Sequence, residues 1–95
     1  MKKYFIYIMS SASKVLYIGV TNNLRRRVQE HQEGLLGGFS QKYKTKKLIY
    51  FEEYKNVNEE LAREKQIKKW RREKKIFLIE TLNYNWNDFS KDFGF

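Results

Sequence analysis

The 95-residue sequence contains no cysteine, no proline and only one histidine. Without cysteine the chain can form neither a disulfide framework nor a thiolate zinc site. A single histidine likewise excludes any site that needs two imidazole groups. Small proteins that are held together by disulfides or by cysteine-bound zinc are therefore excluded as a class.

Long apolar stretches are also missing. The apolar segment after Lys2 and Lys3 covers only residues 4–9 and includes two tyrosines, whereas a signal peptide needs roughly 7–15 apolar residues. No later stretch approaches the roughly 20 apolar residues of a membrane span. We therefore expect a cytoplasmic protein with no membrane partner.

Acidic residues are scarce relative to basic ones. Eleven Asp and Glu stand against 20 Lys and Arg, which gives a net charge of +9 and a pI of about 9.8. Such a surface concentrates polyanions around it, and nucleic acid is the commonest polyanionic partner. An anionic membrane surface or an acidic ribosomal environment would match the same charge, so composition alone does not choose among them.

Aromatic and apolar residues are plentiful. They make up 17% and 41% of the sequence, and bulky rings bury much area per residue in a small core. A chain of this length can build one modest core. We expect a single folded domain over residues 1–95.

The order of strand and helix patterns predicts the fold class. Segments rich in aromatic and β-branched residues predict three strands, at residues 4–9, 15–20 and 48–54. Asn residues that can cap helices and the spacing of apolar residues predict helices at residues 24–33, 58–70 and 76–82, with Asn58 as a cap and with 71–75 left open. A mobile basic loop over residues 35–47 and a closing turn over 86–89 complete the prediction. The fold class is α+β, a three-stranded antiparallel sheet flanked by helices in the order ββαβαα.

Several side chains with catalytic potential fall at informative positions. Tyr7 and Tyr17 lie on adjacent predicted strands, so in a suitable register both hydroxyls project from one face of the sheet. Arg27 and His31 are four residues apart on one helix and share a face. Glu64 is a carboxylate within a basic helix. Each residue alone also fits an ordinary packing or surface role.

The order of these residues resembles the GIY-YIG nuclease superfamily. The second half of that name is present as Tyr17-Ile18-Gly19, and the first half as Phe5-Ile6-Tyr7, with Phe where the motif has Gly. The block of residues 19–27, His31 and the block of residues 63–70 follow in the family's order. Asn83 and Trp86 are similar to the end of the small stand-alone bacterial members, which are likened to the amino-terminal nuclease domain of the excision-repair incision subunit.

The resemblance implies hydrolysis of a DNA phosphodiester with one divalent cation, Mg²⁺ or Mn²⁺. By this resemblance Glu64 would bind the cation and Arg27 would bind phosphate. Tyr7 or Tyr17 would position or deprotonate the attacking water. His31 would shuttle a proton or contact phosphate, Gly19 would leave the backbone open, and Asn83 would stand at the edge of the site. The expected function is a structure-selective or weakly sequence-specific endonuclease, with DNA repair or recombination as the implied setting.

Basic side chains outside the site are candidates for contacts with nucleic acid, and DNA is favoured over RNA. They are Arg25, Arg26, Lys44, Lys46, Lys68, Lys69, Arg71 and Arg72. Among them Trp70 reads as a packing residue rather than as a platform for bases. The alternatives are a non-catalytic nucleic-acid-binding module that keeps the fold, and an adaptor that docks its basic face on an acidic protein.

Overall fold

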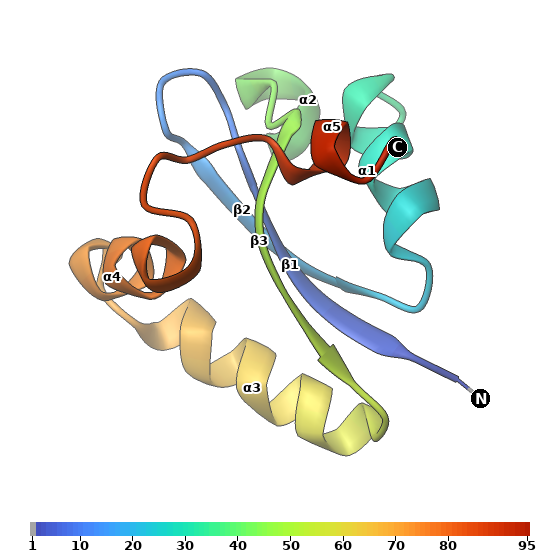
Figure 1. Ribbon diagram of the computed structural model, residues 1–95, viewed down its shortest axis with the longest axis vertical. Helices are drawn as coiled ribbons and strands as arrows, with labels where there is room; N and C mark the ends of the chain where they lie inside the picture. The colour runs from blue at the N-terminus through green and yellow to red at the C-terminus, as the bar shows by residue number, and fades with distance from the viewer. Residues whose placement is uncertain (1) are drawn as a thin grey trace.

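Three antiparallel strands form the central sheet of the computed structural model, which describes residues 2–95. Strand β1 (Tyr4–Ser10) lies between β2 (Leu16–Thr21) and β3 (Lys47–Tyr54), as Figure 1 shows. A bulge interrupts the β1–β3 register, because Ile8 pairs with Tyr50 whereas Met9 pairs with Leu48. The three predicted strands are confirmed, each within one residue at either end.

The first helix begins and ends where its sequence predicts. In α1 (Leu24–Gln32) the Asn23 side chain accepts a hydrogen bond from the backbone N–H of Arg26 at 3.1 Å, which satisfies a donor that the first turn leaves unpaired. The helix stops before Gly34, which has a φ of +71° and suits the left-handed conformation that ends helices.

A short helix replaces part of the loop that the sequence predicts. Helix α2 (Phe39–Tyr43) follows Gly38 and ends at Lys44, whose φ of +54° is left-handed. Its Ser40 is buried and bonds both His31 and Thr45. The prediction of a mobile loop over 35–47 is wrong for this segment, because the Ser40 side chain holds the helix through hydrogen bonds that have no periodic signal in the sequence.

Two helices separated by a break follow β3. Helix α3 (Val57–Lys69) is capped by Asn56, which accepts from the N–H groups of Asn58 and Glu59. The prediction of Asn58 as the cap is therefore two residues late. Trp70 and Arg71 are extended, with ψ of 151° and 158°, before α4 (Arg72–Leu82) begins.

The ring of Trp70 fills the corner between α3 and α4. The cationic groups of Arg63 and Lys74 lie 5.1 Å and 4.4 Å from its centroid, within the range of cation–π attraction. Trp70 is partly exposed, in contrast to the fully buried Ile67 one turn earlier. The chain therefore changes direction at Trp70 without a proline, and two cationic side chains lie over the Trp70 ring at this point.

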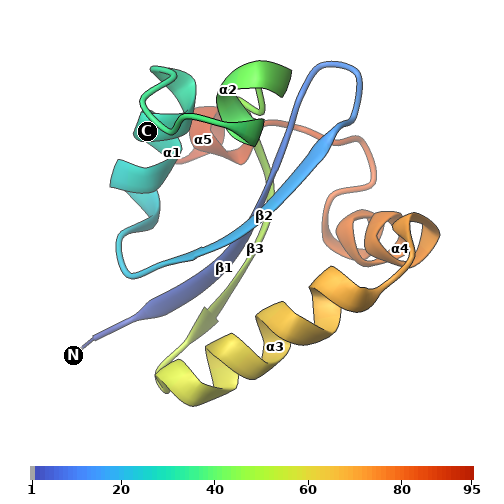
Figure 2. The ribbon, with the colours of Figure 1, turned by 180° about the vertical axis from the view of Figure 1, so that it is seen from behind.

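The sheet is covered on both faces, which divides the core in two. Figure 2 shows α3 and α4 away from the helices α1, α2 and α5 (Phe89–Asp92). Tyr7, Met9 and Val28 form one buried cluster with their neighbours, and Ile8, Ile49 and Ile79 form the other. Alternate residues of β1 enter opposite clusters, as the two-residue period of a strand requires.

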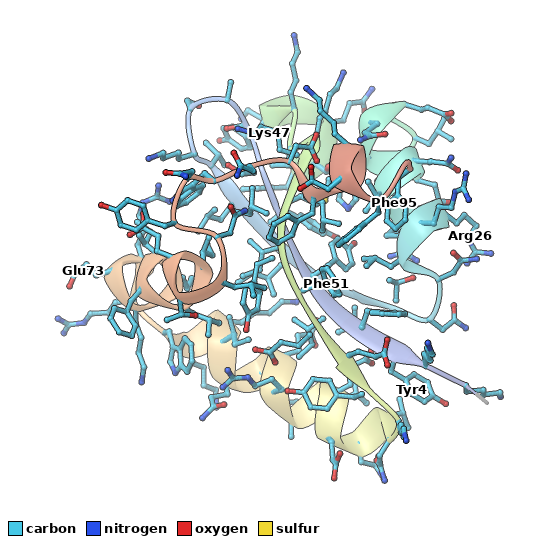
Figure 3. All side chains as sticks on the ribbon, viewed as in Figure 1. Tyr4, Arg26, Lys47, Phe51, Glu73 and Phe95 are labelled. Atoms are coloured by element: carbon cyan, nitrogen blue, oxygen red, sulfur yellow. The ribbon has the colours of Figure 1, made fainter. Side chains whose placement is uncertain are left out.

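The carboxy-terminal segment closes the outer edge of β3. Asn83 donates to the carbonyl of Ile49 at 2.9 Å, and Asp88 accepts from the N–H of Leu48 at 3.1 Å. These bonds satisfy backbone groups that would otherwise form an open edge. Figure 3 shows Phe51 and Phe95 among the side chains on this side of the molecule, and both pack against the Tyr7 cluster. Helix α5 extends the predicted closing turn.

Within residues 2–95 no helix combines the length and the apolar character that crossing a membrane requires.

Candidate active site

Tyr7 and Tyr17 lie on the same face of the sheet. Tyr7 pairs with Gly19 across β1 and β2, and Met9 pairs with Tyr17, so the two tyrosines are diagonal neighbours with ring centroids 6.1 Å apart. Their exposures differ, because Tyr7 is completely buried whereas Tyr17 is partly exposed. The structure brings the two predicted hydroxyls together, and only that of Tyr17 belongs to a side chain that reaches solvent.

Gly19 makes room for Tyr7. A Cβ built on Gly19 would lie 2.5 Å from Oη and 2.6 Å from Cζ of Tyr7. Any side chain at this position would therefore push the phenol away. The last residue of Tyr17-Ile18-Gly19 is needed for packing against the tyrosine of the neighbouring strand.

A buried chain of hydrogen bonds runs inward from Tyr7. Its hydroxyl lies 3.0 Å from Nε2 of His31, whose Nδ1 lies 2.6 Å from Oγ of Ser40. Ser40 in turn lies 2.7 Å from Oγ1 of Thr45. His31 is 3% exposed, so its ring cannot contact a phosphate at the surface. Elements β1, α1 and α2 and the segment after α2 supply the chain, and Ser40 and Thr45 had no signal in the sequence.

The electrostatics of this chain keep it neutral. Burial raises the pKa of Tyr7, and the nearby Arg27 only partly opposes that effect. Burial, followed by the positive charge of Arg27, lowers the pKa of His31 from 6.5 to about 4. At neutral pH His31 therefore has one ring N–H and one lone pair. The donors and acceptors of the hydrogen-bond chain can then run from Tyr7 toward Ser40 or in the opposite direction.

Arg27 lies on the same face of α1 as His31. Its Nε donates to Oε1 of Glu30 at 3.1 Å, and less than one-third of its side chain is exposed. Burial works to lower the pKa of Arg27, but hydrogen bonding and charge from Tyr7 and Glu30 outweigh it and raise the pKa. The guanidinium is thus held beside Tyr7 as a fixed positive charge.

Glu64 lies on the inner face of α3 rather than in the Tyr7 cluster. Its carboxylate bonds Nζ of Lys68 at 2.9 Å, and its side chain is 17% exposed. Glu64 shares the inner stripe of α3 with Glu60 and Ile67, at the spacing of one helical face. The helix packs against all three strands.

Glu60 is a second carboxylate on that stripe, one turn before Glu64. It is 3% exposed, and its Oε2 has no hydrogen-bond partner among the described residues. Burial, and then the negative charge of Glu64, raise the pKa of Glu60. Glu60 was not predicted as a site residue, although its spacing of four residues from Glu64 was a usable signal.

A separate polar cluster fixes α3 to β3. Glu52 accepts from Nε and Nη2 of Arg63 at 3.0 Å and 3.1 Å. The hydroxyls of Tyr50 and Tyr54 donate to the same carboxylate. Burial alone would raise the pKa of Glu52, but the hydrogen bonds from Arg63, Tyr50 and Tyr54 outweigh it and lower the pKa. Because Arg63 precedes Glu64 directly, this cluster sets the position of Glu64.

Asn83 has a structural position. Its Nδ2 donates to the carbonyls of Ile49 and Asn87, and its Oδ1 accepts from the N–H of Asn87, each at 2.9 Å. Asn83 therefore contacts the edge of the sheet, and its place at the edge of the site stays a prediction. Trp86, which followed Asn83 in the resemblance, is buried in the opposite cluster.

The predicted nucleic-acid contacts are all exposed. Arg26 extends into solvent (Figure 3), and Arg72 donates to the carbonyl of Lys14 at 2.7 Å, which ties α4 to the β1–β2 turn. Exposed basic residues of this set occur on α1, after α2, at the end of α3 and at the start of α4: Arg25, Arg26, Lys44, Lys46, Lys68, Lys69, Arg71 and Arg72. The positive charge therefore spreads over several elements.

The donor set fits a divalent cation of the Mg²⁺ type. Glu60 has a buried carboxylate oxygen without a partner, and Glu64 lies one turn away. Mg²⁺ prefers oxygen and is commonly bound through one or two carboxylates plus waters. Among residues 2–95 no group of three or more His, Cys, Asp or Glu is gathered, so water and substrate would supply the remaining ligands.

Comparison with known proteins finds one domain family and a set of relatives of similar length. The GIY-YIG catalytic domain family matches residues 3–76. A UPF0213 protein of Clostridium perfringens is 33% identical over 88 residues, which is 93% of this chain and 95% of that protein. A UPF0213 protein of Syntrophus aciditrophicus is 37% identical over 81 residues, 84% of this chain and 93% of that protein. The solution NMR structure of a UPF0213 protein from Bacillus halodurans has the same fold, with a TM-score of 0.58 at 20% identity over 94% of this chain and 95% of that one.

Proposed function

We propose that the chain, which belongs to the GIY-YIG catalytic domain family, is a metal-dependent endonuclease. Its substrate would be the phosphodiester bonds of DNA. The UPF0213 relatives are small bacterial proteins of similar length. The observation that supports catalysis best is the 3.0 Å contact of the Tyr7 hydroxyl with His31, beside Tyr17 and Arg27. A structure-selective or weakly sequence-specific enzyme suits a chain in which nothing resembles a base-reading element.

The solvent exposure of each residue determines its proposed role. Tyr17 is the tyrosine that reaches solvent, so its hydroxyl orients the attacking water. Tyr7 is buried and remains protonated at neutral pH, so it acts behind Tyr17 by holding the His31 ring through its hydroxyl. Because the pKa of His31 is about 4, its ring is neutral at pH 7 and is a weak base, so its role is to position the Tyr7 hydroxyl through the hydrogen bond at Nε2.

Arg27 stabilises charge at the phosphate. Glu30 holds its Nε, and the planar guanidinium presents further N–H donors in a geometry that suits phosphate oxygens. Negative charge that gathers on a nonbridging oxygen in the transition state would be attracted to this fixed cation.

Glu64, with Glu60 behind it, would hold the divalent cation. When bound there, Mg²⁺ supplies Lewis acidity and neutralises charge on the phosphate. Lys68 bonds Glu64, so binding of a cation would require Lys68 to release that carboxylate. The buried oxygen of Glu60 lowers the cost of that exchange, since a cation relieves the repulsion between the two carboxylates.

A nicking assay tests the proposal. Supercoiled plasmid and branched DNA are incubated with the protein, with Mg²⁺, with Mn²⁺ or with a chelator. We expect nicked product only with metal and none from Glu64→Ala, whereas Glu59→Ala on the exposed side of the same helix retains activity. Equal cleavage by wild type and Glu64→Ala would overturn the assigned role of Glu64.

A second function follows from the burial of Tyr7 and from the ion pair of Glu64 with Lys68. Both features are compatible with a non-catalytic nucleic-acid-binding module, because neither would impair binding. Such a module would bind DNA with an affinity that falls as salt rises, and it would give no product with any metal in the same assay.

A further inference from the structure

Two grooves flank the turn between β1 and β2. The first, of about 450 Å³, lies between this turn, α2 and α4, and its wall includes Lys14, Phe39, Arg72 and Lys75. The second, of about 440 Å³, lies on the α2–β3 side and includes Tyr43, Lys44, Lys46 and Lys47. Both views of the fold place α2 next to this turn (Figures 1 and 2).

Each groove combines three cationic side chains with one aromatic ring. Among the described residues that line them, neither groove contains an Asp or Glu. A third groove near the carboxy terminus differs in this respect, because Asp88 and Asp92 line it. The charge of the two grooves suits a polyanion that follows the surface past the turn.

The two rings are exposed and adjacent. Phe39 is 46% exposed and Tyr43 is 40% exposed, although burial would be expected of large rings in so aromatic a core. Their centroids are 4.7 Å apart, and that of Phe39 is 6.3 Å from Tyr17 of the candidate active site. The three rings therefore form a continuous aromatic path from the surface to the proposed hydroxyl.

We propose that this path is a binding site for an unpaired strand of DNA, whose bases stack on Phe39 and Tyr43 while its phosphates follow the lysines and arginine of the two grooves. Only an unpaired base offers a free face to a ring, because bases in a duplex cover one another. The proposal rests on the proposed function for its claim that the strand leads to Tyr17. The substrate of the nuclease is then DNA with an unpaired segment next to the scissile phosphate.

Binding measurements separate this site from catalysis. The fluorescence anisotropy of labelled oligo-dT, of an equally long duplex and of oligo-rU is measured with a chelator present, so that no cleavage occurs. We expect Phe39→Ala and Tyr43→Ala each to weaken oligo-dT binding about tenfold and to change duplex binding by less than twofold. Phe77→Ala is the matched control, since Phe77 is 72% exposed on α4 and lines neither groove.

Two further arms keep the test decisive. Phe39→Leu retains apolar bulk for folding but has no ring, and it should weaken oligo-dT binding as Phe39→Ala does. Equal losses on duplex and oligo-dT, or no loss on either, would overturn the stacking site, and tighter binding of oligo-rU than of oligo-dT would overturn the assignment to DNA. Ring-dependent binding without nicking would refute the nuclease alone, and nicking without ring-dependent binding would refute this site alone.

Discussion

Gly19 and Tyr7 fit together so closely that a methyl group on Gly19 would lie 2.5 Å from the Tyr7 hydroxyl. The two residues are direct partners across β1 and β2. The family's glycine therefore accommodates the Tyr7 phenol, and changes at Gly19 should affect the Tyr7–His31 contact.

Gly19→Ala should lower both stability and activity. The added methyl must displace a fully buried ring, and overpacking of this kind costs about 1–3 kcal/mol. Thermal or urea denaturation measures the stability, and plasmid nicking measures the activity. Gly37→Ala is the control, because its Cβ would meet nothing closer than 3.9 Å; a loss of equal size there would contradict the argument.

His31 should titrate far below an ordinary histidine. The chain has one histidine, so its imidazole signals in NMR spectra can be followed without assignment, and we expect a pKa near 4. The unfolded chain takes up this proton near pH 6.5 and the folded chain only near pH 4, so stability should fall as pH drops through that window, by on the order of 1–3 kcal/mol. His31→Gln should remove most of this slope, and an unchanged slope would assign it elsewhere.

Glu60→Gln should stabilise the metal-free protein. A buried carboxylate oxygen without a partner is costly, and Glu64 adds repulsion, so we expect a gain of about 1 kcal/mol in the free energy of unfolding at pH 7. The raised pKa of Glu60 means that the wild type becomes more stable as pH falls from neutral toward that pKa, and the variant should lack this trend. Mg²⁺ should raise the melting temperature of wild type more than that of the variant.

Glu52→Gln should weaken the attachment of α3 to β3. The carboxylate receives two hydrogen bonds from Arg63 and two from tyrosines, and a partly buried pair of this kind should contribute about 2 kcal/mol. Its lowered pKa means that this stability is present above about pH 4.5 and is lost as pH falls through the folded value. Glu53→Gln breaks only the exposed pair with Lys3 and should change stability by about 0.5 kcal/mol or less.

A double-mutant cycle with Arg63→Met measures the Glu52–Arg63 coupling directly. Additive losses in Glu52→Gln, Arg63→Met and the double variant would show that the ion pair contributes no coupling of its own.

Sequence patterns predicted the parts of the fold that depend on local periodicity. Alternation along β1 and β2 allowed Tyr7 and Tyr17 to share a face in a suitable register, and the structure supplies that register. A four-residue spacing was sufficient to put Arg27 and His31 on one face of their helix. The first helix cap at Asn23 and the stop at Gly34 are equally local signals. For this reason the sheet and α1 were predicted to within a residue or two.

The features that were missed depend on side-chain contacts rather than on local periodicity. Helix α2 has five residues, too few for a periodic signal, and Ser40 depends on His31 and Thr45 for its position. The break at Trp70, which the sequence left open, coincides with contacts of Arg63 and Lys74 with the Trp70 ring. Asn83 was read through the family resemblance, whereas its hydrogen bonds go to the edge of β3.

The hydrogen-bond chain from Tyr7 ends inside the protein, because Thr45 is fully buried. Hydroxyl protons that water cannot reach exchange slowly, and slow exchange makes them visible as separate resonances in proton NMR spectra. The chain thus has its own spectroscopic signature, a set of low-field hydroxyl and imidazole signals that persist in water. Those signals would report on the state of the interior of the site when a ligand is added.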